Sequence, residues 1–448
     1  MRTPIALAIY VCPVLFASAT GSFAEGPVSV KESASDSLVP DSLVPNWTTV
    51  YEAGLAASQR SDYEESLGLF ERSWETSRTA EQRGASATGV GQTYRRLERV
   101  KEAKEWLERA RLAFSADSRP GSRLAVTTAD LADLYRSTGD YAEAERLLRE
   151  ALVSPACDAE SKGLLRNNLA DLLREEGRST EAQPLFKESI DLGSAPWKQR
   201  AGALIGLADI DRQKGDWEAS VSRWNEALEI CRRERDAGAE AVALRGLGIT
   251  WLTAGSPARA EPLLRRALRI MENKTDMPPE QVASAHSGLA ELYRAENKLA
   301  LAEGEWSRAL QIARTALGEA HPQVAVLMEM LADVYSARGE FGLAREYAGR
   351  ASDTMRSAFG ENSMPVAAAL TNRAAVEERA SAPDAAAKDY ERAVDIARAH
   401  PEYRSFRIVL IQRYAALLKA MHRSREAKDL LAQNGIGAHS FQSSAYQP

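Results

Sequence analysis

The chain has 448 residues, of which 44% are hydrophobic and 27% charged, a composition that suits a folded protein and excludes wholesale disorder. Its formal net charge of −6 argues against a nucleic-acid-binding protein, because neutralising phosphates requires an excess of Lys and Arg. Three Cys and five His leave little scope for a disulfide framework or a Cys/His metal cluster, so no cofactor is predicted.

The first element expected is a secretory signal peptide over residues 1–24. Arg2 is the only charged residue before Glu25, an apolar stretch follows over residues 5–16, and small residues occupy 17–19, 22 and 24. The apolar stretch is shorter than the ~20 residues that span a bilayer, so an uncleaved anchor is the less favoured alternative. Cleavage is expected after Ala24, or alternatively after Ala19.

Residues 25–45 are predicted to form a flexible tether rich in Ser and Pro, with the sequence Asp-Ser-Leu-Val-Pro repeated at 36–40 and 41–45. No transmembrane span is predicted in the mature chain. We therefore expect a protein that is exported, to the periplasm or as a secreted protein, with the bacterial periplasm preferred.

From residue 46 onward the sequence repeats a helix–turn–helix pattern. The clearest copy has apolar or small residues at Leu131, Ala132 and Tyr135, a Gly-Asp break at 139–140, and a second apolar series that begins at Tyr141. Both series have the spacing of amphipathic helices, called here helix A and helix B.

Ten copies share one register, which is marked by small residues at steps of 37 to 42 residues. In helix B they are Ser66, Ala103, Ala144, Ala182, Ser220, Ala260, Ala302, Ala344, Ala386 and Ala427. Twelve residues before each lies another small residue, in helix A: Gly54, Gly91, Ala132, Ala170, Ala208, Gly248, Ala290, Ala332, Ala374 and Ala415. Small side chains at both positions predict that the paired helices approach closely.

This pattern resembles the tetratricopeptide repeat family, whose unit contains Leu-Gly/Ala-x-x-Tyr in helix A and Ala in helix B. Steps near 42 residues, with a junction such as 317–325, resemble the kinesin light chain type. The resemblance implies an all-α, right-handed superhelical solenoid of about ten repeats and twenty helices over residues 46–434, with A helices lining the concave face. Gly435 is expected to stop the last helix, and residues 435–448 to form a loose tail.

No catalytic residue is predicted. His286 falls at a helix A core position and is expected to be a satisfied buried histidine, whereas His321 lies in a junction where a helix-capping role is expected. The Gly-x-Gly fragments at 89–91 and 246–248 lie inside helix A and are not preceded by a strand, which disfavours a nucleotide loop.

Two further groups of residues are expected to have no chemical role. The acidic pairs at 64–65 and 175–176 are adjacent in sequence and are expected on solvated helix faces.

Cys157 and Cys231 are both placed near the end of a helix B, two repeats apart. At ~10 Å per helix layer that separation is too large for a disulfide, so unpaired thiols or an intermolecular bond are expected.

Helix A repeatedly contains an arginine at a position that faces the concave groove in the family. Four have an acid three residues earlier, and Arg95 has none; the pairs are Asp133–Arg136, Asp171–Arg174, Asp209–Arg212 and Glu291–Arg294. The functional interpretation is an arginine-lined groove that binds acidic or carboxylate-ending peptides. The alternative is a set of i,i+3 ion pairs that keep a wet face soluble.

A second groove position, one residue before the Leu of Leu-Gly/Ala, holds asparagines in some peptide-binding family members. Here only Asn168 and Asn372 match it. Four copies have glycines there instead, Gly89, Gly206, Gly246 and Gly288. These glycines either open space for a bulky ligand helix or allow tight helix packing.

The sequence favours a non-enzymatic scaffold that binds a protein or peptide partner, with no nucleic acid, in the concave groove of an extracytoplasmic protein. An accessory subunit of a cell-envelope assembly that docks through its convex face or end repeats is the alternative, and an enzyme with a groove pocket is a remote one. The oligomeric state is not predicted.

Overall fold

A computed structural model of the protein describes residues 46–436, except 61, 98, 118–120, 139, 156, 192–195, 275–276 and 401–402. These residues form twenty α-helices and no strand. The predicted all-α repeat solenoid of about twenty helices is therefore confirmed. The predicted signal peptide, tether and most of the tail lie outside the described residues.

The helices alternate between the two types predicted. The A helices are α3 (Trp47–Gln59), α5 (Ala80–Arg96), α7 (Gly121–Ser137), α9 (Ala159–Glu175), α11 (Trp197–Lys214), α13 (Ala237–Thr253), α15 (Pro279–Ala295), α17 (Pro322–Ala337), α19 (Met364–Arg379) and α21 (Arg404–Ala420). The B helices are α4 (Tyr63–Thr76), α6 (Val100–Ser115), α8 (Tyr141–Val153), α10 (Ser179–Asp191), α12 (Trp217–Arg233), α14 (Pro257–Asn273), α16 (Leu299–Leu317), α18 (Phe341–Phe359), α20 (Pro383–Arg398) and α22 (Ser424–Gln433).

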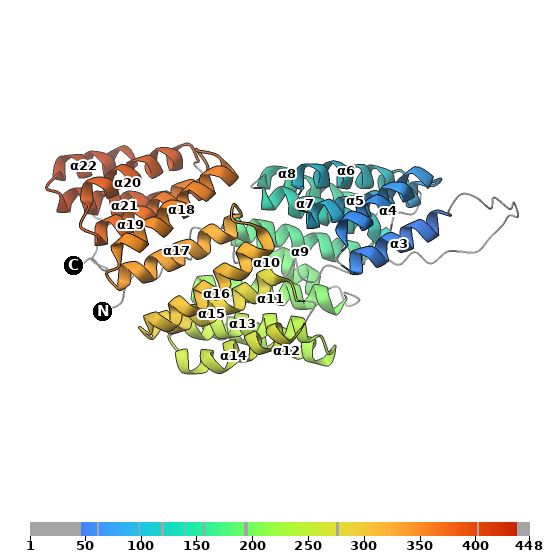
Figure 1. The fold of residues 1–448 in the computed structure, drawn as a ribbon, viewed down its shortest axis with the longest axis horizontal. Helices are drawn as coiled ribbons and strands as arrows, with labels where there is room; N and C mark the ends of the chain where they lie inside the picture. The colour runs from blue at the N-terminus through green and yellow to red at the C-terminus, as the bar shows by residue number, and fades with distance from the viewer. Residues whose placement is uncertain are drawn as a thin grey trace, which may run out of the picture. The chain divides into compact units, whose positions relative to one another are not determined.

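These helices divide into two compact units between residues 235 and 236. The N-terminal unit comprises α3–α12 and the C-terminal unit comprises α13–α22. Within each unit, every A helix packs against the B helix that follows it, and that B helix packs against the next A helix in nearly every case. Figure 1 shows this succession of hairpins in both units.

The small residues predicted to mark each repeat are the points of closest helix approach. All ten small residues of the B helices are fully buried. A Cβ atom added to Gly54 would lie 2.9 Å from the Phe70 ring, and one added to Gly91 would lie 2.7 Å from Leu107. The Ser66 hydroxyl donates to the Gly54 carbonyl at 3.1 Å, which joins the two marker positions directly. The close-approach prediction is confirmed.

In the turn from helix A to helix B, the residue seven positions after the small residue of helix A has a left-handed backbone conformation. Gly215 has φ +77°, and the equivalent positions of later repeats also have positive φ, including Asn297 at 59° and His422 at 61°. Only glycine adopts this conformation without a steric penalty. The next residue then often caps helix B, as Asp216 does by accepting from the backbone N–H of Ala219 at 3.1 Å.

The A helices form the more closely packed side of each unit. Successive A helices contact one another in both units, as α7, α9 and α11 do in the first and α17 and α19 do in the second. Successive B helices touch at most sparsely in the described part of the chain. The stack therefore curves toward its A helices, and the A-helix face is the inner face within each unit.

The ends of individual elements agree with the sequence in one case and differ in another. Gly435 has φ +66° and follows the end of α22, as expected for a helix stop. Cys231 lies near the end of α12, but Cys157 lies in the connection after α8 and not in a helix B, because α8 ends at Val153. Both cysteines are buried and no disulfide joins them.

Candidate functional site

The A-helix face carries polar side chains that bridge successive A helices. We define the N-terminal network as Gln92, Arg95, Asp130, Asp133, Arg136, Asp171, Arg174, Glu175, Asp209 and Arg212. We define the C-terminal network as Glu291, Arg294, Glu329, Asp333, Asn372 and Arg379. Six of the seven predicted partner-binding residues belong to these two networks.

Ion pairs of Asp133 and Glu175 with two arginines link three consecutive repeats. Arg95 on α5 lies 3.4 Å from the Asp133 carboxylate on α7. Arg136 forms the predicted i,i+3 ion pair with Asp133 and also pairs with Glu175 on α9 at 2.6 Å. The structure thus brings Arg95 and Arg136 together on one carboxylate, a link between repeats that the sequence did not predict.

On α9 and α11 the charged groups of the network form ion pairs within each helix, and Asp209 of α11 acts electrostatically on Arg174 of α9. Arg174 lies 3.3 Å from Asp171, and Arg212 lies 3.0 Å from Asp209, as the acid–x–x–Arg spacing predicts. The expectation that Glu175 lies on a solvated face is wrong. Its side chain is only 1% exposed, because it turns toward Arg136 of the preceding repeat.

Burial and charge act in opposite directions on the acids of this network. Burial raises the pKa of Glu175 even though Arg136 and Arg174 lower it. Burial also raises the pKa of Asp130, against the opposing effect of Arg95. At Asp133 burial would raise the pKa, but Arg136 and Arg95 outweigh it and the pKa is lowered. Of these three carboxyl groups, Asp133 is therefore the one whose charged form is favoured.

The C-terminal network repeats this arrangement with more exposed members. Arg294 pairs with Glu291 at 2.7 Å and lies 4.0 Å from Asp333 of the next A helix. Arg379 reaches Asp333 at 2.6 Å from the A helix on its other side. The side chains of Asp333 and Arg379 remain 39% and 46% exposed, so both stay accessible to a partner.

The two predicted asparagines are engaged within the protein. The Asn168 amide donates to the Leu164 carbonyl of its own helix at 3.0 Å. The Asn372 amide donates to the Glu329 carboxyl on α17 at 2.9 Å. The structure therefore does not bring the two asparagines into one shared site.

Glu329 is the most strongly perturbed acid of the C-terminal unit. Desolvation raises its pKa to about 7, and the hydrogen bond from Asn372 offsets this only in part. Its second oxygen is buried and has no hydrogen-bond partner among the described residues. At neutral pH a large fraction of this carboxyl is therefore protonated.

This shift predicts a pH-dependent stability of the C-terminal unit. Because the pKa of Glu329 in the folded protein exceeds the ordinary glutamate value of 4.5, its stabilising contribution is complete below pH 4.5 and is lost as pH rises through about 7. The total loss is at most about 3 kcal/mol. We expect Glu329→Gln to remove this part of the pH dependence in urea unfolding at pH 5 and pH 8. Glu346→Gln, at an exposed site, is the control, and an equal slope in both variants would contradict the assignment.

The glycines of the groove position serve helix packing and not ligand space. A Cβ atom added to Gly206 would lie 2.2 Å from the Phe186 ring, and one added to Gly89 would lie 2.6 Å from the Phe70 ring. Gly288 is less crowded, with Leu264 at 3.2 Å. Of the two alternatives, tight packing is the one that the structure supports.

The two histidines singled out in the sequence have the predicted structural roles. His286 is buried and its Nδ1 lies 2.7 Å from the Glu305 carboxylate, a hydrogen bond that lowers the pKa of Glu305. His321 caps α17 by accepting from the backbone N–H of Gln323 at 3.1 Å, and burial lowers the pKa of His321. Within the described ranges, no group of three or more His, Cys, Asp or Glu side chains is placed to hold a metal ion.

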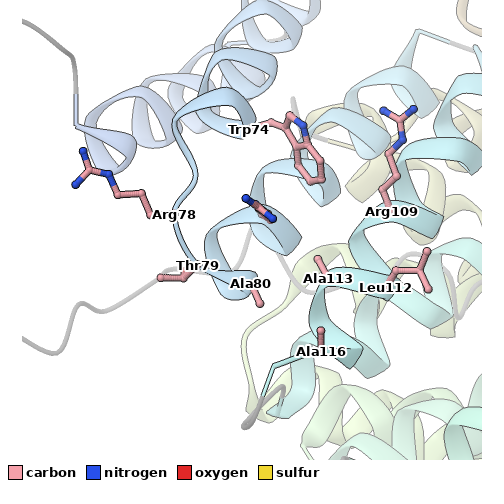
Figure 2. Close-up of a pocket in the computed structure, with 9 residues that line it drawn as sticks. Trp74, Arg78, Thr79, Ala80, Arg109, Leu112, Ala113 and Ala116 are labelled. Atoms are coloured by element: carbon pink, nitrogen blue, oxygen red, sulfur yellow. The ribbon is translucent and has the colours of Figure 1, made fainter.

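A pocket of about 320 Å³ that the sequence did not predict lies between α4, α5 and α6. Figure 2 shows Arg78 and Arg109 on opposite sides of the Trp74 ring, with Leu112 on the α6 wall. Leu112 is 55% exposed and is one of several exposed large apolar residues of the described chain, among them Leu301 at 52%. The lining residues are Trp74, Arg78, Thr79, Ala80, Arg83, Arg109, Leu112, Ala113 and Ala116.

The three arginines of this pocket differ from those of the networks. Arg78, Arg83 and Arg109 are exposed, and none forms an ion pair within the described part of the chain. The Arg109 guanidinium lies over the Trp106 ring at 4.5 Å, and Trp106 in turn packs edge-on against Trp74 at 5.3 Å. The pocket thus has an aromatic wall and a rim of arginines, and no acidic residue lines it.

Two family models match the chain, and both are described as tetratricopeptide repeat. One matches residues 82–152, 199–273 and 281–357, and the other matches residues 129–196. Together these ranges cover more than half of the chain. No curated protein matches the sequence.

Several solved structures are similar to this chain at low sequence identity. BtubC (BKLC) from P. vanneervenii is 21% identical, with a TM-score of 0.45, over 52% of this chain and 95% of its own. Putative kinesin light chain repeats from Podosopora anserina are 17% identical, with a TM-score of 0.38, over 45% and 97%. A tetratricopeptide repeat protein from Parabacteroides merdae is 16% identical, with a TM-score of 0.40, over 64% and 98%.

Proposed function

Because the chain belongs to the tetratricopeptide repeat family, we propose that it is a non-enzymatic scaffold that binds a protein partner on its A-helix face. Repeats of this family generally mediate protein–protein interaction, through the extended concave surface that stacked repeats create. The bound element would be a peptide or a helix of the partner.

The observation that carries this proposal is the exposure of the network members at the A-helix face. Arg95, Asp333 and Arg379 are 36%, 39% and 46% exposed although each makes an ion pair. Their guanidinium and carboxylate groups retain hydrogen-bonding positions that a partner can use. The buried members, Arg136 and Glu175, hold the helices in place beneath them.

This distribution limits which of the predicted residues contact the partner. Arg174 is 9% exposed and Arg136 is 15% exposed, so both act mainly as parts of the protein interior. A partner segment must offer both charge signs, because the accessible groups of the face alternate between acid and base. The proposal therefore replaces a purely arginine-lined groove with a mixed one.

The proposed compartment is extracytoplasmic, with the bacterial periplasm preferred, on the strength of the charged–apolar–small order of residues 1–24. No helix in the described part of the chain is both long and apolar enough to cross a membrane.

The experiment is site-specific photo-cross-linking in intact cells. A benzophenone amino acid placed at Arg95, on the A-helix face, is expected to form an adduct with an exported protein. The matched control places it at Glu229, an exposed residue on helix B of the same unit. Equal adducts at both positions would contradict the A-helix site, and an adduct with a cytoplasmic protein would contradict the compartment.

A second candidate function is docking through an end repeat, as an accessory subunit of a cell-envelope assembly. The pocket formed by α4, α5 and α6 favours it, because it lies in the first two repeats and exposes Leu112.

A further inference from the structure

The pocket between α4, α5 and α6 combines an apolar surface with a cationic rim. Trp74, Leu112 and Ala113 supply the apolar surface. The Trp74 ring is held by its edge-on contact with Trp106, so this wall is fixed by packing. A bulky apolar side chain that enters the pocket would cover the exposed part of Leu112.

The positive charge of the rim is not neutralised by an ion pair among the described residues, unlike that of the A-helix networks. Every arginine of the networks pairs with an acid, whereas Arg78, Arg83 and Arg109 have no ion pair among the described residues. No acidic residue lines the pocket. Guanidinium groups bind carboxylates through paired charge-assisted hydrogen bonds, so the rim is complementary to a ligand with several carboxylates.

We propose that this pocket binds an extended acidic peptide of a partner protein, with one bulky apolar side chain inserted against Trp74 and Leu112. The three arginines come from the α4–α5 connection, from α5 and from α6, so the carboxylates must lie on both sides of the inserted side chain. A volume of about 320 Å³ accommodates one large side chain and its flanking backbone. This volume is near the lower limit for pockets that bind small molecules, because such pockets enclose most of the ligand surface.

This inference rests on the end-repeat candidate and not on the A-helix proposal. The pocket is built from two B helices and the first turn of α5, and none of its lining residues belongs to a network. Loss of binding here would leave the A-helix cross-links unchanged, and the reverse also holds.

The probe is a fluorescein-labelled peptide of sequence Glu-Asp-Leu-Leu-Asp-Glu, titrated against the full chain with anisotropy as the readout. Two companion peptides test each half of the proposal. One replaces the leucines with serines, and the other replaces the acids with their amides. We expect the first peptide to bind, both companions to bind at least about tenfold more weakly, and binding to fall as salt rises.

The variants are Arg83→Glu and Arg109→Glu, with Arg96→Glu as the matched control. Arg96 lies on the same helix as Arg83, at its opposite end, and is also exposed. We expect each pocket variant to weaken binding about tenfold or more, and the control to leave it unchanged. All three substitutions are at exposed positions, so circular dichroism should show the same helical content.

Three results would overturn the proposal. One is no binding of the acidic peptide, and another is equal loss in Arg83→Glu and Arg96→Glu. The third is evidence that the chain's own residues 36–45 occupy the pocket, because this segment also contains acids close to Leu and Val. If Asp36→Asn with Asp41→Asn in the full chain tightens probe binding about tenfold, the occupant is this segment of the same chain and not a partner.

Discussion

Arg136→Met is expected to lower the free energy of unfolding of the N-terminal unit by about 3–5 kcal/mol. The substitution removes the only hydrogen-bond partner of the Glu175 carboxylate within the described residues, since its other oxygen makes none. Glu175 is almost fully buried, so water cannot replace the lost partner without opening the helix interface. The carboxyl must then be protonated or remain uncompensated, and either outcome is costly.

Two further variants separate the ion pair from its packing. The double variant Arg136→Met with Glu175→Leu is expected to recover most of the loss, because two apolar groups replace a buried pair at little or no net cost. Arg146→Met, in an exposed pair with Glu143 and Glu150, is expected to cost less than about 1 kcal/mol.

The measurement is urea unfolding, combined with hydrogen exchange of α7 and α9. Repeats contact only their neighbours, so the loss of protection should concentrate in these two helices. A small effect of Arg136→Met, comparable to that of Arg146→Met, would show that the Arg136–Glu175 pair behaves as an exposed ion pair and not as a buried one.

Gly206→Ala is expected to destabilise the protein by about 1–3 kcal/mol, although alanine is the better helix former. The added methyl group would lie 2.2 Å from the Phe186 ring, which is itself fully buried and cannot move aside freely. Either the ring or the α10–α11 pair must shift. The effect is on stability and not on ligand binding, because this glycine faces the packed interior.

Gly304→Ala is the matched control on a helix surface. Nothing lies within 4 Å of an added Cβ at Gly304, so this substitution should stabilise the protein by about 0.4–1 kcal/mol. Phe186→Leu in the Gly206→Ala background should restore part of the loss, and a double-mutant cycle would show the coupling. Thermal unfolding of five proteins measures all of these terms: the wild type, Gly206→Ala, Phe186→Leu, their double variant and Gly304→Ala. Stabilisation by Gly206→Ala would contradict the close contact.

The repeat register was predictable from sequence because close helix approach leaves a direct mark on residue choice. Only Gly, Ala or Ser fits at the crossing points, and Gly54 against Phe70 shows why a larger residue is excluded. The i,i+3 pairs such as Asp209–Arg212 were predictable for a similar reason, since their geometry depends on one helix alone.

The links between repeats were not predictable in the same way. Arg136 and Glu175 are 39 residues apart, and their contact depends on how one repeat is placed on the next. A sequence shows two adjacent acids at 175–176 but not which one turns inward. The position of Cys157 was not predicted correctly because α8, which ends at Val153, is shorter than most of the other B helices.

The pocket had one signal in the sequence that was not used. Leu112 lies outside the buried series of α6, which comprises Ala103, Leu107, Ala110 and Phe114. A leucine out of register on a polar face is a mark of an exposed apolar surface. Its combination with Arg78 and Arg83 could not be foreseen, because those residues come from the α4–α5 connection and from α5, both of which precede α6 in the chain.

Binding of a protein partner to the A-helix face is tested by a cross-linking comparison in the C-terminal unit. The cross-linker is placed at Arg379, which is 46% exposed on helix A, and at Glu346, which is 57% exposed on helix B. We expect a specific adduct at Arg379, with the same protein that is cross-linked at Arg95, and little or none at Glu346. Adducts at Glu346 alone, or at both positions in equal yield, would contradict it.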